Sequence, residues 1–182
     1  MKSAEHIFKL QPELDAAIIL SQKNRLYYTG FNSTFGVLIL INGAKPHFYT
    51  DSRYFEMAKQ TMSDEDVELH LVGAGDLFGG INEFLFDNKL IKLGYEDTEI
   101  TVAEFNNIKN KLKDAKLIAC GDSIIDQRKI KSEDEIALIT KAQSITDGAF
   151  KNILKFIKVG VSEAEIALEL EYQMKKLGAT GL

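Results

Sequence analysis

The chain is poor in the residues that most often mark covalent or metal-dependent chemistry. Its 182 residues include one cysteine, three histidines, two prolines and no tryptophan. A single cysteine, Cys120, cannot form an internal disulfide, which fits a reducing cytoplasm. Because Lys116–Cys120 has the pattern of a buried strand, we expect Cys120 to be an inert core thiol rather than a nucleophile.

Long apolar runs and an excess of positive charge are missing as well. No run approaches the roughly 20 apolar residues that span a bilayer, and Met1–Leu10 lacks the apolar core of a signal peptide. The formal net charge is −5, so no basic stripe is available to neutralise nucleic-acid phosphates. These absences predict a cytoplasmic protein without membrane or nucleic-acid partners.

Six short runs of apolar and β-branched residues have the length of strands and are flanked by turn residues. They are Ala16–Leu20, Gly36–Ile41, His47–Thr50, Val67–Val72, Ile91–Tyr95 and Leu117–Cys120. The dipeptide Asn42-Gly43 predicts a hairpin between the second and third runs, and Pro46 favours an edge or entry position for the third.

Helical patterns lie between several of these strands. One begins at Asp51, and another has Thr101 as N-cap with Glu104 three residues later. Residues 1–125 are therefore predicted to form one α/β domain, with a mixed six-stranded sheet flanked by helices.

After Gly121 the strand pattern stops and two amphipathic helices are predicted. Ser132 with Glu135, and Ser162 with Glu165, have the spacing of capping boxes that open these helices. Such helices gain most of their stability by packing an apolar face, and little chain remains to cover them. Residues 126–182 are therefore predicted to be the start of a second, truncated domain.

The polar clusters of the sequence favour ordinary structural roles. His6, His47 and His70 fall in different elements without metal-ligand spacing, so we expect surface or strand-flanking histidines. The acidic run at residues 64–66 is typical of a solvated loop, and the run at residues 133–135 of a helix N-terminus. No metal ligand is predicted in the chain.

A glycine-rich segment, Gly73–Gly80, offers an alternative function. It follows a predicted strand and precedes a helical pattern, and the acidic pair Glu96-Asp97 comes about twenty residues later, as in dinucleotide-binding units. The glycine spacing departs from that fingerprint, and Asp76 would bring negative charge close to a pyrophosphate. A glycine loop without a ligand is the competing interpretation.

Arg53 occupies an unusual position for a cation. If Asp51 caps the helix, Arg53 lies in the first turn, where a cation opposes the helix dipole by about 0.3–1 kcal/mol. Arg53 could pair with Asp51 or with Glu56, or it could serve a ligand.

Several segments, in order, resemble the motifs of one family. Thr50–Tyr54 is similar to its T-D-x-R-Y motif, and Leu93–Glu96 to its L-G-x-E motif. Further matches are Asn24–Phe31 with N-x-x-Y-L-T-G-F, Arg128–Ile136 with R-x-x-K-S-x-x-E-I, and the stretches Gly160–Ala167 and Met174–Gly181. Together they resemble the creatinase/aminopeptidase P/prolidase group of pita-bread metallopeptidases over nearly the whole chain.

This resemblance implies a creatinase-type N-terminal domain followed by the first two helices of a pita-bread domain. It implies a parent enzyme, an Xaa-Pro aminopeptidase-type metallopeptidase, that removes the N-terminal residue preceding proline and forms a homodimer. Its two divalent metal ions, often manganese, would activate water. Their ligands, two Asp, one His and two Glu, would follow the end of this chain, so no catalytic residue and no cofactor are expected here.

For residues present in the chain, the resemblance implies two roles. Arg53 would contact the peptide substrate, and the loop residues Phe31, Asn32, Ser33 and Thr34 would lie near an active site, in many members that of the partner subunit. The short loop favours the aminopeptidase P branch over the prolidase branch, whereas Tyr28 and Ser52 depart from the usual motif residues and leave the branch open. A binding or assembly module that keeps the fold without chemistry is the alternative function.

Overall fold

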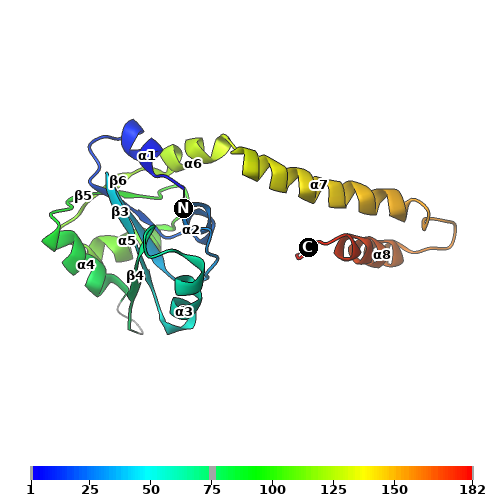
Figure 1. Cartoon of the computed structure of the whole chain (residues 1–182), viewed down its shortest axis with the longest axis horizontal. Coiled ribbons are helices and arrows are strands. Elements are labelled where there is room, and N and C mark those ends of the chain that lie inside the picture. The colour runs from blue at the N-terminus through cyan, green and yellow to red at the C-terminus, as the bar shows by residue number, and fades with distance from the viewer. Residues whose placement is uncertain (1, 74–76, 182) are drawn as a thin grey trace. The chain divides into compact units, whose positions relative to one another are not determined.

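The computed structural model describes residues 2–73 and 77–181, and the chain divides into two compact units, residues 1–129 and 130–182 (Figure 1). The first unit contains one six-stranded sheet with the order β4-β3-β2-β1-β5-β6. The strands are β1 (Ala16–Ile19), β2 (Val37–Ile41), β3 (Ala44–Thr50), β4 (Glu68–Leu71), β5 (Lys92–Tyr95) and β6 (Lys116–Ala119).

The sheet is mixed, as predicted. β1 pairs antiparallel with β2 and β2 with β3, whereas the β1–β5, β3–β4 and β5–β6 pairs are parallel. The predicted hairpin at Asn42-Gly43 is confirmed, and Gly43 has the positive φ of 71° that this turn requires. Pro46 lies near the start of β3, before pairing with β4 begins at His47.

Helices cover both faces of the sheet, which gives the first unit three layers (Figure 1). One face packs against α1 (Glu5–Leu10), α2 (Gln22–Thr29), α3 (Ser52–Thr61) and α6 (Gly121–Lys129). The other face packs against α4 (Leu77–Asp87) and α5 (Val102–Lys111). Central strand β1 sends Ala17 and Ile19 to the first core and Ala16 and Ile18 to the second, so all four side chains are buried.

Local sequence explains where several helices start. Asp51 accepts a hydrogen bond from the Arg53 backbone N–H, and Thr101 forms a complete capping box with Glu104. Both predicted N-caps are confirmed. Helices α1, α2 and α6 were not predicted, because their short sequences show no clear apolar periodicity.

Cys120 lies directly after β6 in the core of the first unit and is 1% exposed. Its Sγ donates a hydrogen bond to the Tyr95 carbonyl at 3.3 Å. Gly94 makes room for the thiol, because a Cβ on Gly94 would approach the Cys120 Sγ to 2.9 Å. Burial raises the pKa of the Cys120 thiol to about 12, with smaller contributions from Glu96 and Asp97. The expectation that Cys120 lies in the core is confirmed, and its low reactivity stays a prediction.

The second unit is a pair of helices, α7 (Glu133–Ile153) and α8 (Glu163–Lys176), that pack on each other. Ser132 with Glu135, and Ser162 with Glu165, form the predicted capping boxes. The apolar stripe of α7 is covered only near its end, where Ala149 and Ile153 are buried, whereas Ile136 is 53% exposed. Among the described residues, no helix is long and apolar enough to cross a membrane.

The burial of Cys120 yields the first prediction. At pH 8 a thiol with a pKa of about 12 is ionised in roughly 1 of 10,000 molecules, and the thiolate is the reactive form. We expect no reaction of the folded chain with a thiol reagent over one hour, followed by modification of one cysteine per chain in guanidinium chloride. Fast modification of the folded protein, at the rate of free cysteine, would contradict this burial.

Candidate functional site

Arg53 lies in the first turn of α3 and its side chain is 65% exposed. Its Nε and Nη2 donate to the Asp51 Oδ2 at 2.9 and 2.7 Å, while its backbone N–H donates to the Asp51 Oδ1 at 3.0 Å. One carboxylate therefore both caps the helix and orients the guanidinium. Nη1 of Arg53 has no partner among the described residues, so one edge of the cation faces solvent.

The Asp51–Arg53 pair explains how a cation is tolerated at a helix N-terminus. The hydrogen bond from Arg53 lowers the pKa of the Asp51 carboxyl group, and the same contact raises the pKa of Arg53. Of the pairings considered from sequence, the structure contains the one with Asp51. This pairing leaves the substrate role of Arg53 open, because it uses only one side of the guanidinium.

The loop that follows α2 lies beside the start of α3. The Phe31 ring is buried and meets the Tyr54 ring edge-on, with centroids 6.5 Å apart. Thr34 is exposed, and its hydroxyl is 2.5 Å from the Tyr54 hydroxyl. Arg53 lies over the Phe35 ring at 5.4 Å, within the range of a cation–π contact. The structure therefore places the 31–34 loop against Tyr54, the residue that follows Arg53 in α3.

The remaining loop residues have different surroundings. Asn32 is exposed, and its Oδ1 accepts a hydrogen bond from the Gln22 Nε2 at 2.8 Å. Ser33 is buried, and its carbonyl accepts a hydrogen bond from Arg25 Nη2 at 2.7 Å. The Ser33 hydroxyl is buried without a partner among residues 2–73 and 77–181.

Arg25 ties this loop to the body of the first unit and was not singled out from the sequence. It is 3% exposed and donates to the carbonyls of Ser33 and Leu20. Burial lowers the pKa of Arg25, and the nearby Glu96 carboxylate opposes that shift. Arg25 is thus a buried cation with carbonyl partners and a counter-charge, which is how such groups are tolerated.

Glu96 is a second residue whose structural role was not predicted from the sequence. It is fully buried at the end of β5. Its Oε2 accepts from the backbone N–H groups of Leu20 and Ser21 at 2.5 and 2.9 Å. Its Oε1 accepts from the Ser21 hydroxyl at 2.7 Å and the Asn24 Nδ2 at 2.5 Å. A single carboxylate therefore holds the N-terminus of α2, where the helix dipole also favours negative charge.

The position of Glu96 corrects the dinucleotide interpretation of Gly73–Gly80. Residues 74–76 of that segment lie outside the described residues, and Gly79 and Gly80 belong to the first turn of α4. The strand before the glycines is β4 and the strand that carries Glu96 is β5, and three strands separate them in the sheet. Because Glu96 is buried under α2, it cannot serve a ribose near the glycines.

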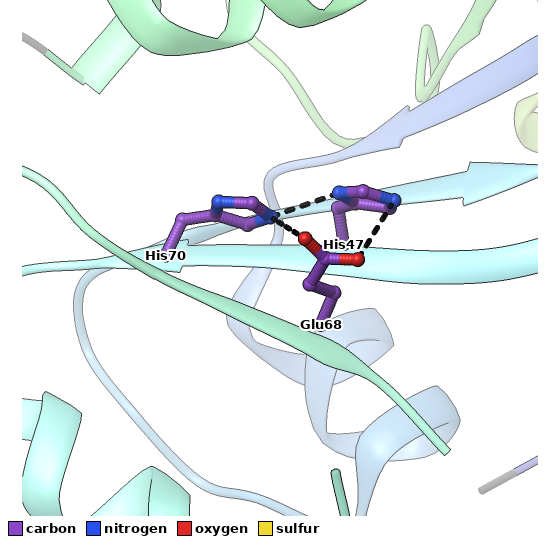
Figure 2. Close-up of side chains that lie close together, drawn as sticks. All are labelled: His47, Glu68 and His70. Atoms are coloured by element: carbon purple, nitrogen blue, oxygen red, sulfur yellow. Dashed lines mark hydrogen bonds and ion pairs between the residues drawn. The ribbon is translucent and has the colours of Figure 1, made fainter. Parts of the chain in front are cut away.

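The structure also corrects the expectation for two histidines. His47 and His70 are not in unrelated elements, because parallel strands β3 and β4 place them side by side. The His47 Nδ1 and His70 Nε2 lie 2.8 Å apart, and the Glu68 carboxylate is 3.8 Å from each ring (Figure 2). His6 lies apart from this group in α1. The sequence did show that His47 and Tyr49 share one face of their strand, and that Glu68 and His70 share one face of theirs, because side chains alternate along a strand. The pairing register between the two strands could not be predicted from the sequence.

Burial lowers the pKa of both histidines. For His47 the neighbouring His70 and Lys45 lower the pKa further, whereas Glu68 opposes the shift. For His70 burial acts against Glu68 alone. Both rings are therefore neutral at pH 7, so one ring nitrogen donates in the His47–His70 contact and the other accepts.

Comparison with known proteins identifies the class of protein to which this fold belongs. Residues 10–130 match the Creatinase/Prolidase N-terminal domain family. The chain is 34% identical to an Xaa-Pro dipeptidase of Pyrococcus horikoshii, over 91% of this chain and 45% of that protein. It belongs to the creatinase/prolidase N-terminal domain family.

Solved structures of Xaa-Pro peptidases match this chain in three dimensions. An X-Pro aminopeptidase from Thermotoga maritima has a TM-score of 0.84 at 30% identity, covering 93% of this chain and 48% of that one. An Xaa-Pro dipeptidase from Bacillus anthracis has a TM-score of 0.85 at 30% identity, with coverage of 97% and 49%. The fold prediction is confirmed, and the chain spans about half the length of the relatives it matches.

The Glu96 network yields the second prediction. Replacing Glu96 by Gln keeps the volume but removes the charge, and the amide NH₂ meets donors that need an acceptor. We expect the free energy of unfolding of the first unit to fall by about 2–4 kcal/mol. Urea unfolding followed by circular dichroism measures this change.

The matched control is Glu83→Gln, which alters an exposed glutamate of α4 and should change the free energy of unfolding by less than about 0.5 kcal/mol. Equal stabilities of the two variants would show that the buried carboxylate does not hold α2.

Proposed function

We propose that this chain is the N-terminal region of a metal-dependent Xaa-Pro peptidase that removes the residue preceding proline. In this proposal the first unit positions substrate and contributes to a homodimer, and residues 126–182 begin the peptidase domain. Membership of the family and the names of the two relatives with solved structures support the reaction class. The chain does not catalyse the reaction alone.

The metal centre that the family implies does not fit the residues of this chain. It requires two Asp, one His and two Glu, whereas the described residues contain one candidate group of at least three ligands, His47, Glu68 and His70. Its two imidazoles and one carboxylate are a different ligand set. We therefore assign no step of the hydrolysis to residues of this chain.

The observation that carries the proposal is the arrangement of Arg53 beside the 31–34 loop. Asp51 holds two nitrogens of the guanidinium, the Arg53 side chain is 65% exposed, and the guanidinium lies over the ring of Phe35, which follows the loop. A planar guanidinium that is fixed on one side suits a carbonyl or carboxylate oxygen of a peptide on the other. Thr34 of the exposed loop bonds to Tyr54, the residue that follows Arg53 in α3.

The exposed apolar side chains of the second unit support the proposal that residues 126–182 begin a peptidase domain. Leu138 of α7 and Leu168 of α8 are 67% and 71% exposed, and several neighbouring apolar side chains are exposed as well. Large apolar side chains in this number usually mark an interface. In a protein with the length of the relatives, the peptidase domain would cover them.

The third prediction tests the role of Arg53. In the protein expressed from its complete reading frame, we expect Arg53→Met to lower kcat/KM for an Xaa-Pro peptide by about ten- to a hundredfold, because one charge-assisted hydrogen bond is lost. Steady-state kinetics with manganese present measure this change. Lys59→Met, at an exposed position of the same helix, is the control and should leave kcat/KM unchanged.

The fourth prediction concerns the 182-residue chain by itself. We expect it to release no product from an Xaa-Pro peptide even with manganese added. The protein from the complete reading frame should release the N-terminal residue under the same conditions. Turnover by the short chain would refute the assignment of catalysis to the other half. No turnover by the complete protein would favour a binding or assembly module with this fold.

A further inference from the structure

The group formed by His47, Glu68 and His70 has no part in the proposed peptidase function. The parallel register of β3 and β4 places His47 opposite Glu68 and Tyr49 opposite His70. Side chains two residues apart on a strand share a face, so both imidazoles and the carboxylate project from the same face of the sheet. Figure 2 shows the three side chains converging, and one ligand atom of each lies within 4.8 Å of the others.

Aromatic neighbours fix the two imidazoles. The Phe84 ring of α4 lies 4.1 Å from the His47 ring, and the Tyr49 ring stacks on His70 at 4.4 Å with an interplanar angle of 13°. The side chain of His47 is 11% exposed and that of His70 is 29% exposed. The ring nitrogens are thus held on a sheet rather than on a loop, which keeps the cost of ordering them low on binding.

The Glu68 carboxylate is the third candidate ligand and lies on the solvent-exposed side of the two imidazoles. Glu68 is 53% exposed, and its oxygens are 3.8 Å from the nearest ring nitrogens, too far for a hydrogen bond. A small shift of this flexible side chain would close the set around one ion. Its exposure also leaves room for water on the open side, as in three-ligand zinc sites.

We propose that His47, Glu68 and His70 bind one divalent transition-metal ion of the zinc type. Two imidazole nitrogens and one carboxylate oxygen are a common set for such ions, whereas Mg²⁺ and Ca²⁺ prefer oxygen ligands alone. A tetrahedral zinc ion holds its ligand atoms about 3.3–3.5 Å apart. One ligand atom from each residue lies within 4.8 Å of the other two, so a shift of the exposed Glu68 side chain is needed to reach that spacing.

This inference departs from the expectation that the chain holds no metal. Without an ion, one hydrogen bond joins the His47 Nδ1 and the His70 Nε2. An ion bound by these nitrogens would displace the proton of that bond. Because β4 is the edge strand of the sheet, an ion held by both strands would fasten β4 to β3. Its consequence is structural, and its test is independent of peptidase activity.

The experiment titrates the tag-free 182-residue chain with Zn²⁺ by calorimetry at pH 7.5, with Co²⁺ as an absorbing probe of the same site. We expect one ion per chain with a dissociation constant in the micromolar range or below. Mn²⁺ should bind far more weakly, since it stands at the low end of the affinity order for such ligands. At a hundred times the dissociation constant, Zn²⁺ should raise the melting temperature of the first unit by about 5–10 °C.

Paired variants decide which residues bind the ion. His70→Gln and Glu68→Gln should each weaken Zn²⁺ binding by at least about tenfold, and Glu68→Gln alters an exposed side chain that folding does not require. His6→Gln and Glu65→Gln remove the same chemical groups outside the cluster and should bind as the original chain does. Absence of saturable binding below 100 μM Zn²⁺ (about −5.5 kcal/mol by the affinity relation), or equal binding by all four variants, would overturn the proposal and leave a hydrogen-bonded histidine pair.

Discussion

The candidate site depends on one buried carboxylate. Glu96, at the end of β5, accepts four hydrogen bonds from the segment between β1 and α2 and thereby fixes where α2 begins. From α2, Arg25 reaches the carbonyl of Ser33 and holds the loop that packs on Tyr54 beside Arg53. The buried Glu96 carboxylate is tolerated because both of its oxygens accept hydrogen bonds. The position of the exposed Arg53 side chain therefore depends on the position of the buried Glu96 carboxylate.

The two polar sites of the first unit are built in different ways. Arg53 is held by a single carboxylate at a helix start and remains largely exposed. His47 and His70 stand on paired strands and are held by aromatic rings, so their geometry exists before any ligand arrives. Rigid elements suit an ion, which demands fixed distances.

Much of the fold could be predicted because its signals are local. The six strands, the Asn42-Gly43 turn and the capping boxes depend on residues a few positions apart. Helix α2 could not be predicted in this way, because its buried face is polar: Asn24 donates to Glu96, 72 residues away, and Arg25 donates to the carbonyls of Leu20 and Ser33. A helix whose buried face is polar shows no apolar periodicity, so this pattern does not predict it. Roles for Arg53 and the 31–34 loop were predicted from motif resemblance, and only the structure showed that the loop packs on Tyr54, next to Arg53 in α3.

By itself, the sequence determined the element types, the mixed α/β class and the capped start of each of the last two helices. Residues close in the chain are sufficient for these features, because caps, turns and alternation involve neighbours. Only the tertiary structure decided which polar groups far apart in the chain meet: Glu96 with α2, and His47 with His70 and Glu68. The physical reason is strand register. A parallel pairing between distant strands sets which side chains are opposite each other, and a shift by one residue would turn them to the other face.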